Sequence, residues 1–351
     1  MRMPEIISSL TEAGRWAPSA DNTQPWHFHW DGQVLALRYD SRHKAGFPVH
    51  YQATLLTMGA VIENVVQMAN AFGLPRVWKW QIPRVEPYEF FSIRLEGFLQ
   101  SSSLIANLPL FQRHTNRLPF TKEPLPGTFL NLLSGLSDSS ISVRVFEGTA
   151  RLKEVAELIR DASEARFQTR EIHEWFARSL RFDRAEVEMG DGLDVSTFGL
   201  PLGGRALLRF ISDWKRMSWL NRINGYKLLA AIEASSMTKA GAVIAVIGKP
   251  GMEAALEAGM MMERVWIKAN AAGLGVQPYY IVPDQIVRLA EGSVPDELAL
   301  KVAKLQTDTR NVLGLNEETL YMLFRVGHPI CVPVRSKRLP LEMVFSVNQK
   351  D

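Results

Sequence analysis

The sequence contains very little cysteine and no long apolar run. Cys331 is the only cysteine among 351 residues, which excludes an intramolecular disulfide framework and a cysteine-rich metal site and predicts a reducing compartment. Its apolar neighbours, Pro329-Ile330 and Val332-Pro333, predict a buried thiol. No apolar stretch approaches membrane-spanning length, and residues 1–9 lack the apolar core of a signal peptide. The sequence therefore predicts a cytoplasmic protein.

Three common catalytic patterns are missing or incomplete. The Gly-x-Ser-x-Gly elbow that carries the nucleophile of many hydrolases does not occur. Ala242–Gly248 is typical of a strand, but Lys249-Pro250-Gly251 after it lacks the full Gly-x-Gly-x-x-Gly spacing of a dinucleotide-binding turn. His27 and His29 share one face of a strand, and no carboxylate or third histidine is placed to complete a metal site. These absences argue against such a hydrolase, such a turn and a metal centre.

The charge balance is mild. The formal net charge is +3, and the basic residues are not gathered into runs, so nucleic acid is not an expected partner. A hydrophobic share of 46% and a charged share of 22% are typical of a soluble globular protein with an ample core. The length fits two or three domains, or one large body with internal pseudo-symmetry.

An internal repeat organises the chain. The stretch 59–83 recurs as 259–283, and both copies carry apolar side chains at helical spacing. Each should form a long amphipathic helix that ends near Gly73 or Gly273, where a left-handed residue is favoured. Two copies predict a fused pseudo-dimer of two halves, 1–108 and 109–351, around two long central helices. The shared positions are Gly59/Gly259, Glu63/Glu263, Val65/Val265, Ala69/Ala269, Asn70/Asn270, Ala71/Ala271, Gly73/Gly273, Leu74/Leu274 and Pro83/Pro283.

The remaining pattern predicts an α+β protein with a mainly antiparallel or mixed sheet in each half. Asp31-Gly32 between two strand-like runs is typical of a tight hairpin turn. The segment 198–236 has no counterpart in the first half, and we expect a helical insertion there. Further expected helices are 4–14, 129–136 and 150–165, and the expected strands are 27–30, 33–39, 77–81, 90–95, 141–146, 242–247 and 321–332.

Three polar clusters are candidates for a binding site. They are the loop 18–26 (Pro-Ser-Ala-Asp-Asn-Thr-Gln-Pro-Trp), the stretch 113–117 (Arg-His-Thr-Asn-Arg) and the tail 335–338 (Arg-Ser-Lys-Arg). Guanidinium and ammonium groups suit a phosphate, whereas the hydroxyl and amides of the loop suit a planar polar ring or a polyol. The first half has only the loop, and the second half has only the arginines. Two half-sites, one from each copy, should therefore make one complete site.

These residues resemble the nitroreductase family. Residues 17–26 are similar to that family's Pro-Ser-x-x-Asn-x-Gln-Pro-Trp loop, and residues 113–117 are similar to its Arg-Arg/His-Ser/Thr-x-Lys/Arg flavin motif. The run Gly-Leu-Gly-Val-Gln-Pro at 273–278 resembles the segment that passes beside the flavin ring. In that family, homodimers bind FMN at the subunit interface. The fused arrangement with one site resembles the tandem-repeat, Acg-type branch, some members of which hold FMN under a lid.

The resemblance implies FMN as the cofactor and NAD(P)H as the electron donor. Arg113 would meet the phosphate, and Arg117 would meet the pyrimidine edge, where a cation tunes the reduced flavin. Catalysis would centre on the flavin, so no side chain is expected to act as a strong general acid. The other implied cofactor contacts are His114 and Thr115, Pro18, Ser19, Asn22 and Gln24 from the first half, Gln277 and Pro278 beside the ring, and Arg335 and Lys337 at the phosphate.

Two functions are compatible with the sequence. The first is an FMN-dependent oxidoreductase that passes a hydride from NAD(P)H through flavin N5 to a nitroaromatic, quinone, enone or other small organic acceptor. The second is an FMN storage or sequestration protein, with 198–236 as a lid and Tyr279 and Tyr280 crowding the ring. The basic, aromatic stretch 214–226 within that lid would alternatively suit a membrane surface. Because both half-sites lie on one chain, a monomer would suffice, and the sequence leaves a homo-oligomer open.

Overall fold

The computed structural model describes residues 5–40, 47–74, 78–95 and 106–348. The first half contains α1 (Glu5–Arg15), β1 (Trp26–Trp30), β2 (Val34–Tyr39), α2 (Gln52–Ala71), β3 (Trp78–Trp80) and β4 (Glu89–Arg94). Its sheet has the strand order β11-β1-β2-β4-β3, in which β11 (Phe345–Val347) comes from the other end of the chain. Neighbouring strands are antiparallel except β1 and β11, which are parallel.

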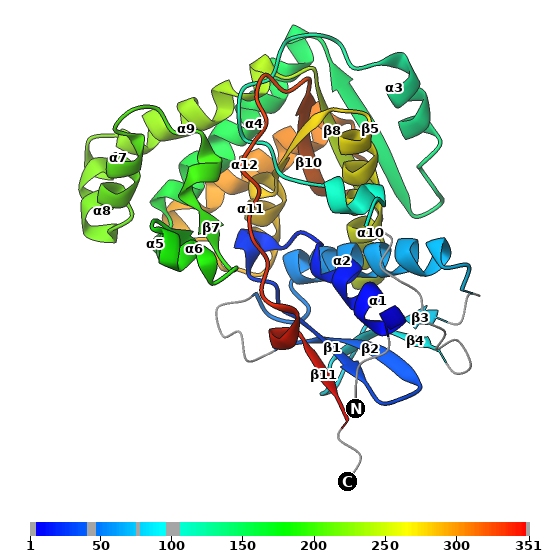
Figure 1. Ribbon diagram of the computed structural model, residues 1–351. Helices are drawn as coiled ribbons and strands as arrows, with labels where there is room; N and C mark the ends of the chain where they lie inside the picture. The colour runs from blue at the N-terminus through cyan, green and yellow to red at the C-terminus, as the bar shows by residue number, and fades with distance from the viewer. Residues whose placement is uncertain (1–4, 41–46, 75–77, 96–105, 349–351) are drawn as a thin grey trace.

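The second half forms a four-stranded antiparallel sheet in the order β5-β8-β10-β9, with helices packed around it (Figure 1). Helices α11 and α12, from the end of the second repeat onward, are not predicted from the sequence. The elements of this half are η2 (Pro109–Gln112), α3 (Gly127–Ser134), β5 (Ile141–Glu147), α4 (Thr149–Gln168), α5 (Arg170–Ser179), β6 (Leu180–Arg181), α6 (Arg184–Glu188), β7 (Leu193–Asp194), η3 (Val195–Phe198), α7 (Gly204–Ile211), α8 (Trp214–Arg222), α9 (Gly225–Ser235), η4 (Met237–Lys239), β8 (Ala242–Gly248), α10 (Met252–Ala271), β9 (Gly275–Tyr279), α11 (Ile281–Ala290), α12 (Asp296–Leu313) and β10 (Thr319–Gly327).

The two sheets repeat one arrangement. The order β1-β2-β4-β3 in the first half matches β5-β8-β10-β9 in the second, and every one of these neighbouring pairs is antiparallel. In each half a helix precedes the first strand of this set, and a 20-residue helix, α2 or α10, follows the second. The predicted α+β architecture, with an antiparallel or mixed sheet in each half, is confirmed.

The halves differ in how their first two strands are joined. Asp31 and Gly32 connect β1 to β2 directly, with the Asp31 carboxylate accepting hydrogen bonds from the Gln33 and Val34 amides at 2.8 Å. The equivalent strands β5 and β8 are joined by residues 148–241, which carry α4 to α9. The expected insertion 198–236 is therefore only one part of a longer excursion, which we call the 148–241 excursion.

The long helices α2 and α10 meet through a backbone contact between glycines. A Cβ atom on Gly59 would lie 2.0 Å from the Leu256 carbonyl oxygen, and one on Gly259 would lie 2.2 Å from the Leu56 carbonyl oxygen. These four positions obey the same offset as the sequence repeat, so each half makes the same contact with the other. Because no side chain fits there, the glycines allow the two halves to pack side by side (Figure 1).

Two features of the helices test the sequence predictions. Gly73 and Gly273 follow the helix ends with φ angles of 66° and 75°, which confirms the predicted left-handed ends. The prediction of an amphipathic α2 is wrong over its first part, since every residue from Gln52 to Val65 is buried. Packed among α1, α10 and the strands of the first sheet, this part of α2 has no solvent-facing side.

The C-terminal segment crosses from the second half back to the first. After β10 it runs along the molecule, with an isolated bridge from Pro329 to Phe120, and ends as β11 beside β1 (Figure 1). The predicted strand 321–332 is thus wrong beyond Gly327. The prediction of a buried Cys331 is also wrong, because the thiol lies on this exposed crossing segment, where Val332 is 94% exposed. Among the described residues, none of the helices has the length and apolarity needed to cross a bilayer.

The glycine contact predicts a severe effect for a single methyl group. Gly259→Ala should lower the free energy of unfolding by about 3 kcal/mol or more, because the new Cβ meets backbone atoms of α2. Urea unfolding measures the change. Gly127→Ala on α3 is the matched control, since a Cβ there would have no neighbour within 4 Å. Equal stability of the two variants would contradict the packing described here.

Candidate functional site

The loop between α1 and β1 contains backbone conformations that few residues adopt. Asp21, Asn22 and Gln24 have φ angles of 48°, 57° and 53°. Asp and Asn tolerate the left-handed region better than most residues, whereas Gln24 is held there by its surroundings. The Ser19 hydroxyl accepts a hydrogen bond from the Gln24 amide at 3.0 Å, and Pro18 fixes the chain before it. The loop is therefore rigid because its own sequence and its contacts both constrain it.

The amide side chains of this loop hold two distant segments. Asn22 Nδ2 donates to the Gly192 carbonyl at 3.0 Å and to the Lys337 carbonyl at 3.2 Å. Gln24 Oε1 accepts from the Leu339 amide at 2.9 Å, and its Nε2 donates to the Gly190 carbonyl at 2.9 Å. The loop thus fastens the C-terminal crossing segment and the 148–241 excursion to the first half.

Arg113 lies buried at the junction of the two halves. Its Nε is 2.9 Å from Glu263 Oε1 on α10, and its Nη2 donates to the Trp16 carbonyl at 2.6 Å. The guanidinium also lies over the Trp266 ring, 4.7 Å from its centroid. Burial lowers the pKa of Arg113 and raises that of Glu263, and their attraction opposes both shifts. Arg113 therefore joins α10 to the end of α1 as one member of an internal ion pair.

His114 and Thr115 follow along α10. The His114 amide donates to Asn270 Oδ1 at 2.8 Å, and its carbonyl accepts from Trp266 Nε1 at 2.9 Å. Burial, with smaller contributions from Arg335 and Arg113, lowers the pKa of the His114 imidazole, so the ring is neutral near pH 7. Thr115 is half-buried. These contacts fix the backbone of the stretch 113–117 against the central helix.

Arginines from three segments gather around Trp16. The guanidinium carbons of Arg335 and Arg338 lie 5.3 and 5.8 Å from the centroid of its ring, and that of Arg15 lies 5.9 Å away. Arg335 Nη2 donates to the Arg113 carbonyl at 2.9 Å, and Arg338 Nη1 donates to Asn22 Oδ1 at 3.0 Å. The loop 18–26, the stretch 113–117 and the tail 335–338 therefore meet, as the complementarity of the halves predicts.

The tail contributes a different side chain from the one expected. Lys337, predicted as a phosphate ligand, is outside the Trp16 cluster, and its ammonium pairs with Glu188 of α6. Arg338, for which the sequence predicts no ligand role, lies half-buried in the cluster instead, with its Nε atom buried. Burial first, and then the nearby charge of Arg113, lowers the pKa of Arg338 to about 9. No local pattern in a basic tail distinguishes the inward arginine from its neighbours.

The Trp16 cluster carries an excess of positive charge. Arg15 is neutralised by Glu12, at 2.5 Å, and Arg113 by Glu263. Arg335 and Arg338 form no ion pair with any residue that the structure describes, and Arg338 Nε is buried without a hydrogen-bond partner there. Two uncompensated guanidinium groups at a partly buried junction are an arrangement that a divalent anion would stabilise.

Arg117 points toward the 148–241 excursion. Its Nη1 donates to Thr197 Oγ1 at 3.1 Å, and its guanidinium lies over the Phe198 ring. On the other side of this region, Asp21 Oδ2 accepts from Trp175 Nε1 at 2.7 Å, and burial raises the pKa of Asp21. The segment from α5 to η3 therefore covers the loop and Arg117.

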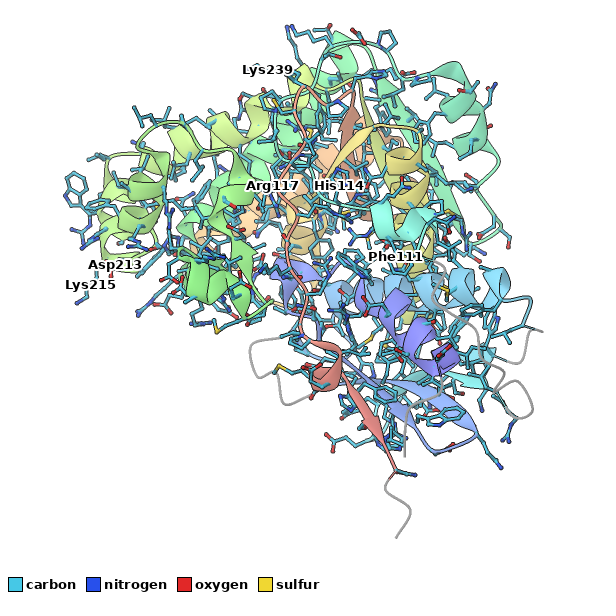
Figure 2. All side chains as sticks on the ribbon, viewed as in Figure 1. Phe111, His114, Arg117, Asp213, Lys215 and Lys239 are labelled. Carbon is cyan, nitrogen blue, oxygen red and sulfur yellow. The ribbon has the colours of Figure 1, made fainter. Side chains whose placement is uncertain are left out.

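The lid predicted at 198–236 lies largely elsewhere. Figure 2 shows Asp213 and Lys215, at the start of α8, at the outer end of the molecule, well away from Arg117 and His114. From that part, Phe198 contacts Arg117, and Ser236 Oγ lies 2.7 Å from the Tyr279 hydroxyl. Helices α7 and α8 contact each other, and α8 also contacts α4, α5 and α9 of the same excursion.

Gln277 and Pro278 lie on β9, opposite Arg325 and Phe324 of β10. Gln277 Oε1 is buried and has no hydrogen-bond partner among the described residues. A buried amide oxygen without a donor loses hydration free energy, so a ligand that donates a hydrogen bond there would be favoured.

Known proteins resemble this chain at low sequence identity. No family model matches the chain. It is 24% identical over 302 residues to "Probable NAD(P)H nitroreductase PigM" of Serratia sp. (strain ATCC 39006), covering 79% of this chain and 80% of that protein. Over most of its length the chain is therefore similar to a probable nitroreductase. The Acg-type branch is not distinguished by these comparisons.

Two further proteins are similar to this chain. It is 23% identical over 352 residues to "Uncharacterized protein MT1398" of Mycobacterium tuberculosis (strain CDC 1551 / Oshkosh), covering 95% of this chain. The chain spans about half the length of that relative, 47%. The crystal structure of the FMN-dependent nitroreductase NfnB from Mycobacterium smegmatis in complex with NADPH aligns over 70% of this chain and 98% of that chain, with 15% identity and a TM-score of 0.41.

The structure bears on two other sites considered from the sequence, the dinucleotide-binding turn and the metal site. Strand β8 has antiparallel neighbours on both sides, so it is not part of the parallel unit that a dinucleotide-binding turn requires. His27 and His29 both contact Ser346 Oγ of β11, at 2.8 and 3.0 Å. Across the described ranges, no three His, Cys, Asp or Glu side chains are arranged to hold a metal ion.

A second buried carboxyl lies near Asp21. The Tyr51 hydroxyl donates to Asp284 Oδ1 at 2.9 Å, and Phe47 stacks between the rings of Tyr51 and Trp175 at 4.8 and 5.2 Å. Burial raises the pKa of Asp284 to about 6, although the hydrogen bond from Tyr51 opposes the shift. An aromatic stack thus joins Asp284 to the Trp175 side chain that bonds Asp21.

The charge excess predicts specific stabilisation by phosphate. Sodium phosphate should raise the thermal unfolding temperature of the flavin-free protein more than sodium chloride at matched ionic strength, because a divalent anion offsets Arg335 and Arg338. Arg338→Gln should remove most of this difference. Arg205→Gln, an exposed change on α7, is the control. An unaltered phosphate effect in Arg338→Gln would show that the anion binds elsewhere.

The raised pKa of Asp284 predicts a pH dependence with a definite sign. The folded state holds this proton up to about pH 6, whereas the unfolded chain releases it near 3.8. The contribution of Asp284 to stability is therefore present below about pH 4 and is lost as the pH rises through 6. The free energy of unfolding of the wild type, relative to Asp284→Asn, should fall by at most about 3 kcal/mol between pH 4 and 7. A rise over that range, in urea unfolding, would contradict the assignment.

Proposed function

We propose that this chain is an FMN-dependent oxidoreductase that uses NAD(P)H to reduce a small organic acceptor. The observation that carries the proposal is the pair of uncompensated arginines, Arg335 and Arg338, at the junction where three polar segments from both halves meet. The resemblance of those segments to nitroreductase motifs, and the similarity to PigM, support the same reading. We propose NAD(P)H as the electron donor and a small organic molecule as the acceptor.

The residues at the junction fit FMN in charge and in polarity. The two unpaired guanidinium groups match a phosphate dianion, and Arg338 Nε is an unused buried donor. Gln277 Oε1 is an unused buried acceptor on β9, where a ring nitrogen that donates a hydrogen bond would satisfy it. A single ligand with an anionic end and a polar planar end would therefore meet both needs.

Arg335 and Arg338 would hold the phosphate. Arg117 would lie at the pyrimidine edge, since its guanidinium stays protonated even though burial lowers its pKa. Arg113 would act on the phosphate only through its charge, because its side chain is already paired with Glu263. The lining of the site would be completed by His114, Thr115, Ser19, Pro18 and Pro278.

Asn22 and Gln24 would act as positioning residues. Their amide groups bind the carbonyls and amides of the crossing segment and of residues 190–192. Through Asn22 Oδ1, which accepts from Arg338, the first half orients an arginine that belongs to the second. When bound, FMN supplies the two-electron chemistry that carries reducing equivalents from NAD(P)H to an acceptor.

A storage or sequestration role is the second candidate, and one observation favours it. The segment from α5 to η3 contacts the site at three places, Trp175 to Asp21, Gly192 to Asn22 and Thr197 to Arg117. A cover fastened by side-chain hydrogen bonds on both halves would hinder entry of a nicotinamide ring. This role uses the same cofactor residues and differs only in access.

We also propose that one chain makes one complete site as a fused pseudo-dimer of the Acg-type branch. The matching strand orders and the reciprocal contacts of Gly59 and Gly259 support this organisation. The halves 1–108 and 109–351 would correspond to the two subunits of a dimeric relative, with β11 exchanged onto the first sheet. A monomer would then bind one FMN, and homo-oligomers would need no shared site residue.

The proposal predicts a flavin spectrum that NAD(P)H bleaches. Purified protein, reconstituted with FMN if colourless, should show flavin absorption bands that fade anaerobically on addition of NADPH or NADH. Dithionite is the control for a reducible flavin. Bands that fade with dithionite alone would favour sequestration, and a protein that takes up no FMN would overturn both functions.

A further inference from the structure

Among the described residues, one face of α2 is uncovered where its counterpart on α10 is covered. On α10, Glu263, Trp266 and Asn270 are buried beneath the stretch 110–114, which bonds to each of them. The equivalent positions on α2 are 63, 66 and 70. Asn70 is exposed there, and Gln67 beside it is half-exposed. No described segment of the first half plays the part of the stretch 110–114.

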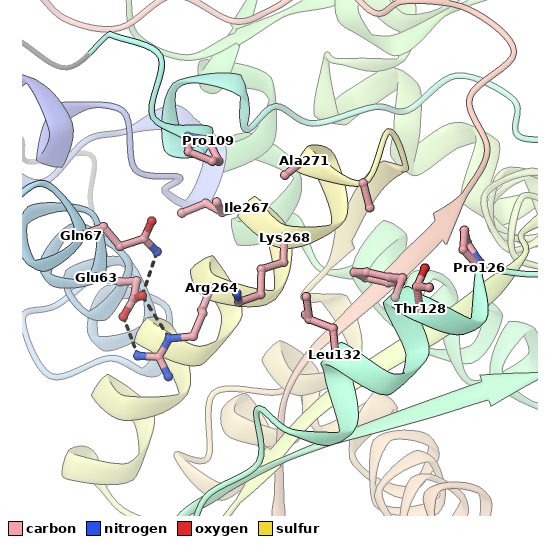
Figure 3. Close-up of a pocket in the computed structure, with 12 residues that line it drawn as sticks. Glu63, Gln67, Pro109, Pro126, Thr128, Leu132, Arg264, Ile267, Lys268 and Ala271 are labelled. Carbon is pink, nitrogen blue, oxygen red and sulfur yellow. Dashed lines mark hydrogen bonds and ion pairs between the residues drawn. The ribbon is translucent and has the colours of Figure 1, made fainter. Parts of the chain in front are cut away.

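A groove of about 730 Å³ lies beside this uncovered face, between α2, α10 and α3 (Figure 3). Phe129 and Leu132 of α3 and Ile267 of α10 give it apolar walls, and Pro109 closes one end. Leu132 is 40% exposed, which makes it one of the more solvent-accessible leucines of the protein. The groove is separate from the Trp16 cluster, because none of its lining residues belongs to that cluster.

The polar side of the groove has a net positive charge. Both Glu63 oxygens are engaged, by Arg264 Nε at 3.0 Å and Nη2 at 2.7 Å and by Gln67 Nε2 at 2.9 Å. The bonds from Glu63, and a smaller effect of Asp138, raise the pKa of Arg264. Lys268, one turn along α10 from Arg264, makes no ion pair or hydrogen bond with a described residue. Figure 3 shows Lys268 on α10 between Arg264 and Leu132, with its ammonium group toward the Arg264 side.

We propose that this groove binds an amphipathic carboxylate, an acid with one anionic head and an apolar chain or ring. Lys268 is the unpaired cation for the head, since the charge of Arg264 one turn away is already paired with Glu63. Phe129, Leu132 and Ile267 supply the apolar surface for the body of the ligand. A purely apolar ligand would leave Lys268 desolvated, and a small anion would leave the apolar walls in water.

The site does not depend on the flavin. Its test therefore reads binding and not turnover. Isothermal titration of the full chain with decanoate should give saturable binding with a Kd below about 1 mM. Acetate, which has only the head, and decanol, which has only the chain, should each bind at least about ten-fold more weakly.

Two variants locate the ligand. Lys268→Gln should weaken decanoate binding by about ten-fold or more, since a charge-assisted hydrogen bond is lost. Lys153→Gln, an exposed lysine on α4, is the matched control and should leave the affinity unchanged. Ala271→Phe, at an exposed groove position near the end of α10, should also weaken binding by filling the space. A cooperative urea-unfolding transition of each variant reports that it is folded.

Three outcomes would overturn the proposal. One is the absence of saturable decanoate binding to the wild type. Another is equal affinity of Lys268→Gln and the wild type, which would place the ligand elsewhere. The third is binding of decanol as tight as that of decanoate, which would mean that Lys268 does not recognise the head.

Discussion

The backbone contact between α2 and α10 is the constraint on which the rest of the structure depends. Gly59 and Gly259 each lie against a backbone carbonyl of the other helix. Because the space there cannot hold even a methyl group, the point at which the helices cross is fixed. One turn further, Glu63 and Glu263 are therefore held at the same junction, each buried and each paired with an arginine. A buried carboxylate needs such a partner, and the choice of partner is where the two halves diverge.

On one side the partner is Arg113, which arrives on a separate segment and carries the polar stretch 113–117 against α10. That segment also contacts the first half and the crossing tail. The Trp16 carbonyl accepts from Arg113 and Arg338, and the Arg113 carbonyl accepts from Arg335. On the other side Glu63 is satisfied by Arg264 from the neighbouring helix, and no described segment covers it. One repeated pair of helices thus produces a polar junction on one side and an open groove on the other.

Much of this arrangement can be predicted from local sequence patterns. The hairpin at Asp31-Gly32, the helix ends at Gly73 and Gly273 and the repeated long helices follow from turn chemistry and periodicity, and the structure has them. The meeting of the three polar clusters could be anticipated, because each half carried only part of a site. Arg338 and the crossing of the tail could not, since the inward arginine is selected by contacts with Asn22 and Trp16, more than 300 positions away. The burial of α2 was likewise set by its neighbours and not by its own pattern.

The charge at the junction would link the binding of an anionic cofactor to folding. In the free protein, Arg335 and Arg338 are brought near Arg113 and Arg15 with only two carboxylates for four guanidinium groups, which raises the free energy of the folded state. An anion bound there would relieve this repulsion only when the loop, the stretch 113–117 and the tail are in place together. Because these segments come from both halves and both ends of the chain, a phosphate group would stabilise the junction as a unit. The same charges that destabilise the free chain are therefore what would give the site its affinity for a phosphorylated cofactor.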